Sequence, residues 1–313
     1  MKFFFMLFSA LACALSQAPA GIAAEKAAEP EGTYLYARHD GQDLFLDLYH
    51  SPKHSPEKPT LIYIFGGGFK DGARDRQAHR VWFNDMLELG YNVVSIDYRL
   101  GLKDASDAGV NKKFIRQLEN AIDLAVEDLF SATLFLIENS DELNIDADNL
   151  VLAGASAGAI TALQAEWYIS NSSPKASILP RGFNYSGVMA FSGAVFSRKG
   201  KVRFGANMCP TALFHGTADT MVPYDKISFL RLHFDGSNQL AKQLVKDGKA
   251  FRIYRYTGNG HEISVAMPHI MDQILPFLEE DVIKKTGSSV DVTVDNPDIP
   301  VPDWAMDDYK SLY

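Results

Sequence analysis

The sequence lacks a long basic run, the usual zinc motifs and the usual phosphate-binding loops. Its formal net charge of −9 makes it a poor candidate for binding nucleic acid or an anionic membrane surface. No H-E-x-x-H or C-x-x-C spacing is present, so neither a metal site nor a cofactor is predicted. Neither G-x-x-x-x-G-K-[ST] nor G-x-G-x-x-G occurs, which argues against nucleotide binding.

The composition favours one sizeable domain. The chain has 313 residues, of which 47% are hydrophobic and 22% charged, enough to bury one substantial core. We assign residues 25–286 to a single catalytic domain, and no internal repeat is visible. Residues 287–313 are rich in Asp, Val and Pro, and they predict an extended C-terminal tail, with docking through Trp304 and Tyr309 as one option.

The first 24 residues have the pattern of a signal peptide. A lysine precedes an apolar stretch at residues 3–15 that is too short to span a bilayer, and small residues follow it. Cleavage after Ala20 or Ala24 would give a secreted or periplasmic protein in which Cys209 stands alone, without a disulfide partner. Residues 9–13 also resemble a lipoprotein signal, in which Cys13 would carry a lipid anchor.

Strand-like and helix-like segments alternate along the chain. Residues 33–38 and 43–49 alternate apolar and polar positions and predict an antiparallel hairpin. Nearly continuous apolar runs, typical of parallel strands buried on both faces, occupy residues 61–65, 92–97 and 150–153. Further strands are predicted at residues 186–191, 211–215 and 251–256. Helical spacing covers residues 81–87, 114–138, 157–166, 239–246 and 270–283. This order predicts an α/β fold with a mostly parallel central sheet and helices on both faces.

Residues 154–158 read G-A-S-A-G between an apolar strand and a helix. A G-x-S-x-G turn in that position presents the serine hydroxyl at the edge of the sheet, beside the helix N-terminus. Only residues with little or no side chain leave room for so tight a turn. Ser156 is therefore a candidate nucleophile.

Three glycines follow the apolar strand at residues 61–65. Successive glycines can turn their N–H groups toward one point and form an anion-binding nest. With the Ala157 N–H as a further donor, Gly67 and Gly68 could hold the oxyanion of an acyl-transfer intermediate. A flexible turn is the alternative interpretation.

Two more loops follow predicted strands and carry an acid and a base. Asp219 lies in a loop after residues 211–215, where a carboxylate can orient an imidazole, although Asp is also an ordinary turn residue. His261 lies on a glycine-rich loop after residues 251–256, from which it can reach toward Ser156. The order Ser156, Asp219, His261, each after its own strand, makes the set specific. Four other histidines are interpreted as surface residues: His39, His50, His54 and His79.

Residues 33–284 resemble the α/β-hydrolase superfamily, and within it the carboxylesterases with an HGGG-type oxyanion loop. These include acetyl and feruloyl esterases of the hormone-sensitive-lipase-like group. The resemblance depends on residues 65–69 (F-G-G-G-F), residues 95–100 (S-I-D-Y-R-L), the Ser156 turn, the Asp219 loop and the Gly260-His261 pair. It implies Ser156 as nucleophile, His261 as base and then acid, and Asp219 as the orienting acid. It also implies oxyanion donors at Gly67, Gly68 and Ala157.

The sequence departs from the family at Phe65, where the oxyanion loop usually begins with histidine. The backbone donors should survive this change, whereas a side-chain role in fixing the loop would be lost. Asp97, Tyr98 and Arg99 resemble a structural motif of the family and are interpreted as scaffold.

The chain leaves little room for a lid, because only residues 192–210 separate two late strands. We therefore expect an open site suited to esters on bulky or polymeric substrates. Four basic residues crowd this segment: Arg198, Lys199, Lys201 and Arg203. They are either contacts for uronic acids or a feruloyl-bearing glycan, or a solvated basic loop.

The sequence thus predicts a secreted serine esterase acting on short-acyl esters, such as acetyl or feruloyl groups on plant polysaccharide. Chemistry through an acyl-enzyme needs no cofactor. One alternative is a serine peptidase of the prolyl-oligopeptidase type, although such peptidases usually carry a propeller domain for which this chain has no room. The other is a non-catalytic binding protein with the same fold.

Overall fold

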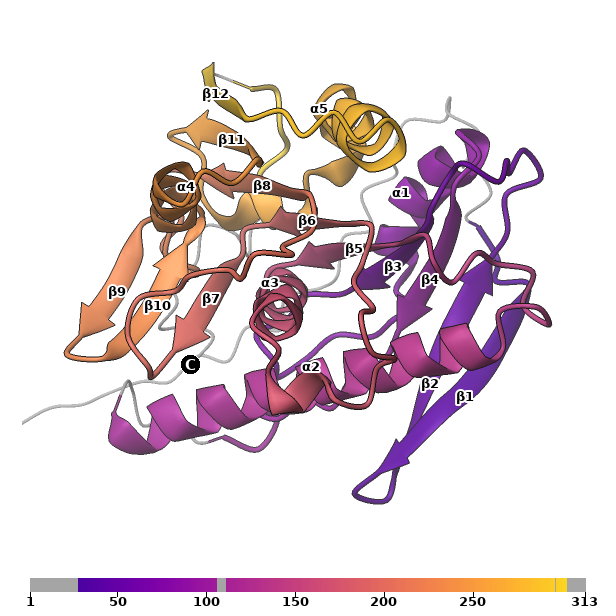
Figure 1. Ribbon diagram of the computed structural model, residues 1–313, viewed down its shortest axis with the longest axis horizontal. Coiled ribbons are helices and arrows are strands. Elements are labelled where there is room, and N and C mark those ends of the chain that lie inside the picture. Colours follow the sequence, from indigo (N-terminus) through magenta and orange to yellow (C-terminus); the bar gives the residue numbers. More distant parts are fainter. Residues whose placement is uncertain (1–27, 106–110, 296, 303–313) are drawn as a thin grey trace, which may run out of the picture.

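The structure is a computed structural model that describes residues 28–105, 111–295 and 297–302. The predicted signal peptide, Cys13, Trp304 and Tyr309 lie outside these residues. Within the described chain, nine strands form one sheet in the order β1-β2-β4-β3-β5-β6-β8-β11-β12 (Figure 1). Only β1, β2 and β4 pair antiparallel with one another, and every later neighbour pairs parallel. The predicted mostly parallel sheet is confirmed.

The predicted hairpin is β1 (Gly32–His39) and β2 (Gln42–Tyr49), which turn at Asp40 and Gly41 with φ of 51° and 78°. Two positive φ values in a two-residue loop match the twist of the strands that the loop joins. The central strands are β3 (Thr60–Ile64), β4 (Asn92–Ile96), β5 (Leu150–Ala155), β6 (Gly187–Phe191), β8 (Thr211–Gly216) and β11 (Arg252–Thr257).

Helices cover both faces of the sheet. Figure 1 shows α2 (Lys112–Glu138) and α3 (Ala157–Ser170) on one face. On the other face lie α1 (Gln77–Glu88), α5 (Met271–Pro276) and the π-helical turn η4 (Phe277–Ile283). The remaining helix, α4 (Ser237–Lys246), follows the strand β10 (Leu232–Gly236).

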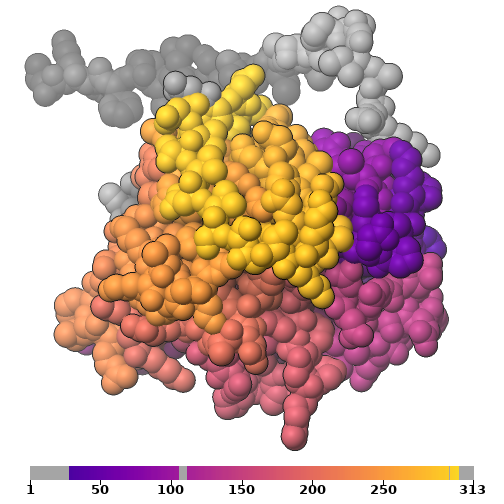
Figure 2. Space-filling model, turned by 45° about the horizontal axis from the view of Figure 1, so that its top comes forward, coloured from indigo at the N-terminus to yellow at the C-terminus, as the bar shows by residue number. Residues whose placement is uncertain are grey.

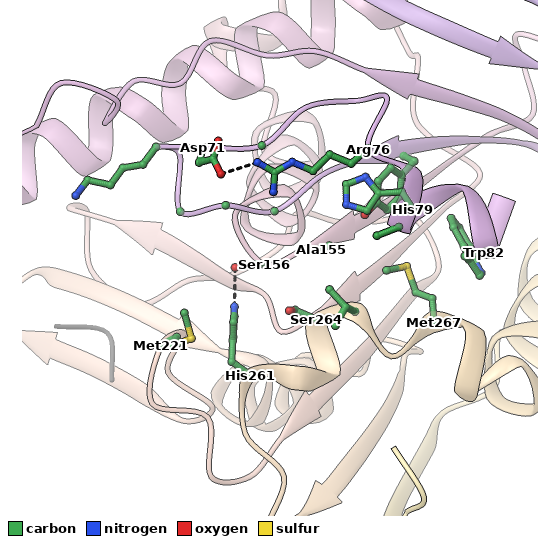
Figure 3. A pocket seen from close by; sticks show the side chains of 18 of the residues that line it. Asp71, Arg76, His79, Trp82, Ala155, Ser156, Met221, His261, Ser264 and Met267 are labelled. Carbon is green, nitrogen blue, oxygen red and sulfur yellow. Dashed lines mark hydrogen bonds and ion pairs between the residues drawn. The ribbon is translucent and has the colours of Figure 1, made fainter. Parts of the chain in front are cut away.

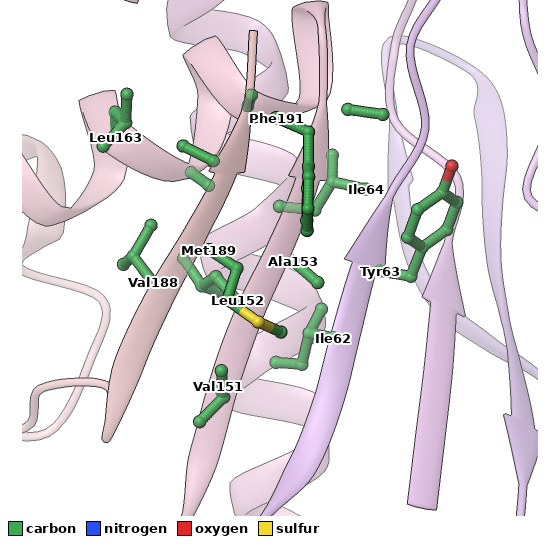
Figure 4. Close-up of a cluster of buried hydrophobic side chains, with 14 of the residues drawn as sticks. Ile62, Tyr63, Ile64, Val151, Leu152, Ala153, Leu163, Val188, Met189 and Phe191 are labelled. Carbon is green, nitrogen blue, oxygen red and sulfur yellow. The ribbon is translucent and has the colours of Figure 1, made fainter. Parts of the chain in front are cut away.

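The core is densest where β3, β5 and β6 lie side by side. Ile62, Leu152 and Val188 come from these three strands, lie opposite one another in the register and are fully buried (Figure 4). Tyr63 points away from them, to the opposite side of β3, and packs against Trp82 and Phe83 of α1. Strands buried on both faces explain why the sequence shows continuous apolar runs here instead of alternation.

A second, smaller sheet was not predicted from the sequence. Within the described residues, β7 (Ala194–Ser197), β10 and β9 (Lys226–Phe229) pair antiparallel in the order β7-β10-β9. The short segment between β6 and β8 therefore enters this sheet instead of remaining a plain loop. Gln164 of α3 anchors it, because the Gln164 side chain exchanges two hydrogen bonds with the Phe196 backbone.

Part of the predicted C-terminal tail extends the large sheet. Residues Val290–Asp295 form β12, which pairs parallel with β11. The remaining short helical turns are η1 (Pro174–Ala176), η2 (His261–Val265) and η3 (Met267–His269). In the part of the chain that the structure describes, no helix has the length and apolar character that a membrane span needs.

Candidate active site

The candidate site lies where the parallel strands β3, β5, β8 and β11 end. Residues 66–68 follow β3, Ser156 follows β5, Asp219 follows β8 and His261 follows β11. The carboxyl ends of parallel strands meet at one edge of a sheet, so four loops distant in sequence converge there.

Ser156 has the backbone conformation of a sharp strand-to-helix turn, with φ 52° and ψ −115°. A non-glycine residue rarely adopts such a conformation, which costs roughly 1–3 kcal/mol and persists only where surrounding packing enforces it. Here close contacts between backbone segments hold Ser156 in this conformation. A Cβ on Gly158 would lie 2.0 Å from the Ile64 carbonyl oxygen, and one on Gly154 would lie 2.3 Å from the Gly158 carbonyl oxygen.

The three predicted triad residues form one chain of hydrogen bonds. His261 Nε2 lies 2.7 Å from Ser156 Oγ, and His261 Nδ1 lies 2.8 Å from Asp219 Oδ2. Figure 3 shows the His261 ring pointing at the Ser156 hydroxyl. Both His261 and Asp219 are buried, which shields their contact from water. The structure thus brings all three residues together, in the geometry that nucleophilic catalysis requires.

Asp219 is held rigidly by its own loop. Its Oδ1 accepts hydrogen bonds from the backbone N–H groups of Met221 and Val222, at 2.9 and 3.0 Å. Its Oδ2 also lies 3.3 Å from Nε2 of the fully buried His215. Burial alone would raise the pKa of Asp219, but the hydrogen bonds from His215 and His261 outweigh it and hold the pKa well below its ordinary value. The carboxylate is therefore ionised at neutral pH.

The glycine loop faces Ser156. Gly67 and Gly68 have φ of 120° and 62°, and the Gly67 carbonyl accepts backbone hydrogen bonds from Lys70 and Asp71, both at 3.0 Å. Neither the Gly67 nor the Gly68 N–H donates a backbone hydrogen bond within the described residues. The Ala157 N–H belongs to the first turn of α3, where N–H groups have no intrahelical partner.

The structure accounts for Phe65, where the resembled family has histidine. The Phe65 ring is buried and stacks on Tyr98, with ring centroids 4.4 Å apart. The Tyr98 hydroxyl donates a hydrogen bond of 2.9 Å to the Phe65 carbonyl oxygen. Aromatic packing and this buried hydrogen bond therefore hold the start of the glycine loop.

The other residues of the interpreted scaffold motif tie the antiparallel strands to α2. Arg99 is buried and pairs with Asp128 of α2 through its Nε and through its backbone N–H. Asp97 accepts hydrogen bonds from the Phe45 backbone and from Arg74. None of these side chains lines the pocket around Ser156, in keeping with a structural role.

A cavity of about 530 Å³ opens from Ser156. Figure 3 shows Ser156, His261 and Met221 at one end and His79, Trp82 and Met267 at the other. An ion pair between Asp71 and Arg76 crosses the loop above the cavity, with the charged atoms 2.5 Å apart (Figure 3).

The interpretation of His79 as a surface residue was wrong. Its ring packs against Tyr63, with centroids 4.9 Å apart, and it lines the cavity. Burial, together with the positive charge of Arg76, lowers the pKa of His79 to about 4, so this ring is neutral at physiological pH. His79 lies three residues before Trp82 on α1, so helical spacing places the two side chains on the same face of the helix. Spacing alone did not show that this face meets the cavity.

The basic segment at residues 198–203 lies away from the cavity, since none of its four cations lines it. Arg198 pairs with Glu119 of α2, and Arg203 pairs with Asp247 after α4. Among the described residues, no group of three or more His, Cys, Asp or Glu side chains is placed to hold a metal ion.

The fold and this arrangement of residues define an α/β-hydrolase-fold protein. Residues 46–173 match the family model described as BD-FAE. The esterase Est2 of the Planctomycetes species Thermogutta terrifontis, solved with propionate bound, superposes with a TM-score of 0.59 at 19% identity. That match covers 82% of this chain and 94% of the esterase. The predicted α/β-hydrolase fold is confirmed.

Curated relatives match a shorter part of the chain. An ethyl acetate hydrolase of Pseudomonas putida is 29% identical over 139 residues, and Lipase 2 of Moraxella sp. (strain TA144) is 26% identical over 155 residues. These matches cover 43% and 45% of this chain, but only 38% and 32% of the relatives' own length.

Proposed function

We propose that the protein is a serine esterase that hydrolyses short-acyl carboxylic esters through an acyl-enzyme on Ser156. The hydrogen-bonded chain from Ser156 through His261 to Asp219 carries this proposal. The names of the relatives support its substrate class, since one is an ethyl acetate hydrolase and one structure holds propionate.

The geometry supports a two-step acyl transfer. His261 Nε2 takes the proton of Ser156 Oγ as the oxygen attacks the ester carbonyl, and the imidazolium then gives that proton to the leaving alcohol. Asp219 holds the ring with Nδ1 protonated and stabilises its charged form. A water molecule, activated by the same ring, then releases the acid from Ser156.

The N–H groups of Gly67, Gly68 and Ala157 are the proposed donors to the developing oxyanion. Two of them lie on a loop that Tyr98 and Phe65 hold in place, so the donors are oriented before the substrate binds. Fixed donors of this kind act without reorganisation, and losing one typically costs about a hundred- to a thousandfold in kcat.

We further propose that the natural substrates are acetyl or feruloyl esters on plant polysaccharide. The cavity opens to the surface beside a short loop that carries the Asp71–Arg76 ion pair, which suits an ester on a bulky carrier. Rates on acetylated xylan, a feruloyl ester, a chain-length series of p-nitrophenyl esters and a proline amide would rank the substrates. Preference for the amide would favour a peptidase.

Secretion is also part of the proposal and is supported by the pattern of residues 1–24. N-terminal sequencing of the protein from its native host tests it. A mature chain beginning at residue 21 or 25 is expected for ordinary cleavage. A lipidated N-terminus at Cys13 would identify the lipoprotein route, and an intact Met1 would contradict export.

The central test is Ser156→Ala, with Ser55→Ala as a matched control. Ser55 precedes β3 and so lies at the amino edge of the sheet, away from the cavity. We expect Ser156→Ala to abolish p-nitrophenyl acetate hydrolysis and fluorophosphonate labelling while thermal unfolding stays near wild type. Activity retained in a clean preparation would refute the role of Ser156. A wild-type protein inert to every ester and to the fluorophosphonate would favour a binding protein.

A further inference from the structure

The hairpin formed by β9 and β10 carries a large apolar surface that the fold does not bury. Ile227, Phe229 and Leu230 are 60%, 72% and 85% exposed, and all four residues of β9 are exposed. Figure 1 places β9 at the outer edge of the small sheet, and Figure 2 shows this orange segment projecting at the left margin of the molecule. Exposed apolar side chains that cluster in this way mark a contact surface.

The turn of this hairpin holds a leucine where glycine would be favoured. Leu230 has φ of 54° in the two-residue connection between β9 and β10. Glycine adopts positive φ without steric cost, whereas leucine is strained there. Leu230 is 85% exposed, so packing within the described chain does not account for a leucine at this strained position.

Cations flank the apolar hairpin. Arg231 lies in its turn, Lys226 begins β9 at the other end of the strand, and Lys199 and Lys201 belong to the loop after β7. That loop lies against the turn, since the Gly200 N–H donates a 2.9 Å hydrogen bond to the Arg231 carbonyl oxygen. All four cations are exposed.

Other charged groups near the patch already have partners. Asp225 pairs with Lys242, and Arg198 and Arg203 pair with acids on α2 and after α4. The four flanking cations make no ion pair with any residue in the described ranges. The hairpin and the adjoining loop therefore present apolar side chains flanked by cations that form no ion pair within the described residues.

We propose that this tip, residues 199–201 and 226–231, docks on an anionic lipid surface. Phe229 and Leu230 enter the interface between headgroups and acyl chains, while the cations contact lipid phosphates, as in other interfacial anchors. A second copy of the chain fits less well, because joining two such surfaces would bring the same four cations of both copies toward one another. The chain as a whole carries −9, so the attraction is local to the tip.

Vesicle co-sedimentation of the purified chain tests this inference without depending on esterase activity. We expect binding to vesicles of phosphatidylcholine mixed with phosphatidylglycerol, weakened by high salt, and little binding to phosphatidylcholine alone. The variant Lys226→Gln/Phe229→Ser should reduce binding by roughly tenfold or more. Its matched control is Val245→Ser/Lys246→Gln, which removes one exposed apolar side chain and one cation from α4 and should bind as wild type.

Leu230→Gly separates docking from folding. Because glycine accepts the positive φ, we expect an unchanged or higher Tm together with weaker vesicle binding. No co-sedimentation of the wild type with either vesicle would overturn the proposal, and so would equal losses in the α4 control. A concentration-dependent dimer in analytical ultracentrifugation that Leu230→Gly dissociates would assign the surface to a second copy and overturn the lipid assignment.

Discussion

Asp219 is the residue on which most of the site's electrostatics converge. Two backbone N–H groups and two histidines surround its carboxylate. His215 adds a contact that the sequence did not predict, because its only sequence signal was its place at the end of a strand. Its Nδ1 in turn lies 2.8 Å from Ser237 Oγ, which orients the ring toward Asp219. A carboxylate with this many partners is fixed in position before any substrate arrives.

Asp219→Asn tests the orienting role at the residue scale. The amide is nearly isosteric but carries no charge to stabilise the His261 imidazolium, and it no longer favours the tautomer with Nδ1 protonated. We expect kcat for p-nitrophenyl acetate to fall by roughly 10⁴-fold with little change in KM. Steady-state kinetics would measure the effect, with the exposed Asp225→Asn as control. A wild-type kcat in Asp219→Asn would refute the assignment.

At the scale of elements, α3 links the site to a buried acid. The helix begins beside Ser156 and carries Glu166 two and a half turns later, fully buried. Glu166 Oε1 accepts hydrogen bonds from the Cys209 backbone and from Asn184, while its Oε2 has no partner among the described residues. Burial raises the pKa of Glu166 to about 7.

Glu166→Gln tests the consequence for stability. A carboxyl whose pKa is raised on folding contributes full stability below its ordinary pKa of 4.5 and loses it as pH rises through about 7. We expect this group to lower the free energy of unfolding by roughly 3 kcal/mol over that range, and Glu166→Gln to remove that part of the pH dependence. Urea unfolding at pH 5 and pH 8 would measure it. The exposed Glu142→Gln should behave as wild type, and an unaltered slope in Glu166→Gln would contradict the expectation.

At the scale of the whole molecule, β12 completes the sheet beyond β11. It covers the edge of the strand whose end carries His261, and Asp291 of β12 pairs with Arg255 of β11. An uncovered edge strand exposes unpaired backbone groups that can recruit another chain. The C-terminal segment therefore protects the sheet in addition to any role of its own.

Removal of residues 287–313 should expose β11 as the new edge. We expect a lower Tm and faster aggregation on heating, with kcat per folded molecule retained, because no residue of β12 lines the cavity. Differential scanning fluorimetry and light scattering would measure both effects. Asp291→Asn, which breaks only the partly exposed ion pair, should change stability by no more than about 1 kcal/mol. A truncated chain as stable and soluble as the full one would contradict this role for β12.

The sequence predicted the large elements, and the three candidate residues that it singled out lie together in the structure. Apolar runs located β3, β4, β5, β6 and β8, because strands buried on both faces leave a signal in local composition. The strand β11 was predicted from a run that two arginines interrupt. The sequence did not predict β7, β9 and β10, because these strands are short or exposed and lack that signal. It also did not predict β12, an outer strand that pairs with β11 alone. His79 was misplaced for a related reason: local spacing does not report which face of a helix meets a cavity.

The local pattern alone determined that a serine turn, a glycine loop, an acid and a histidine each follow a buried strand. Parallel pairing then obliges those loops to meet, so the candidate site could be predicted without coordinates. Only the tertiary structure decided how Phe65 is held by Tyr98, that His215 reaches Asp219, and that cations from two separate segments gather around Leu230. These contacts join residues distant in the chain, and close packing selects them by shape, which no local pattern records.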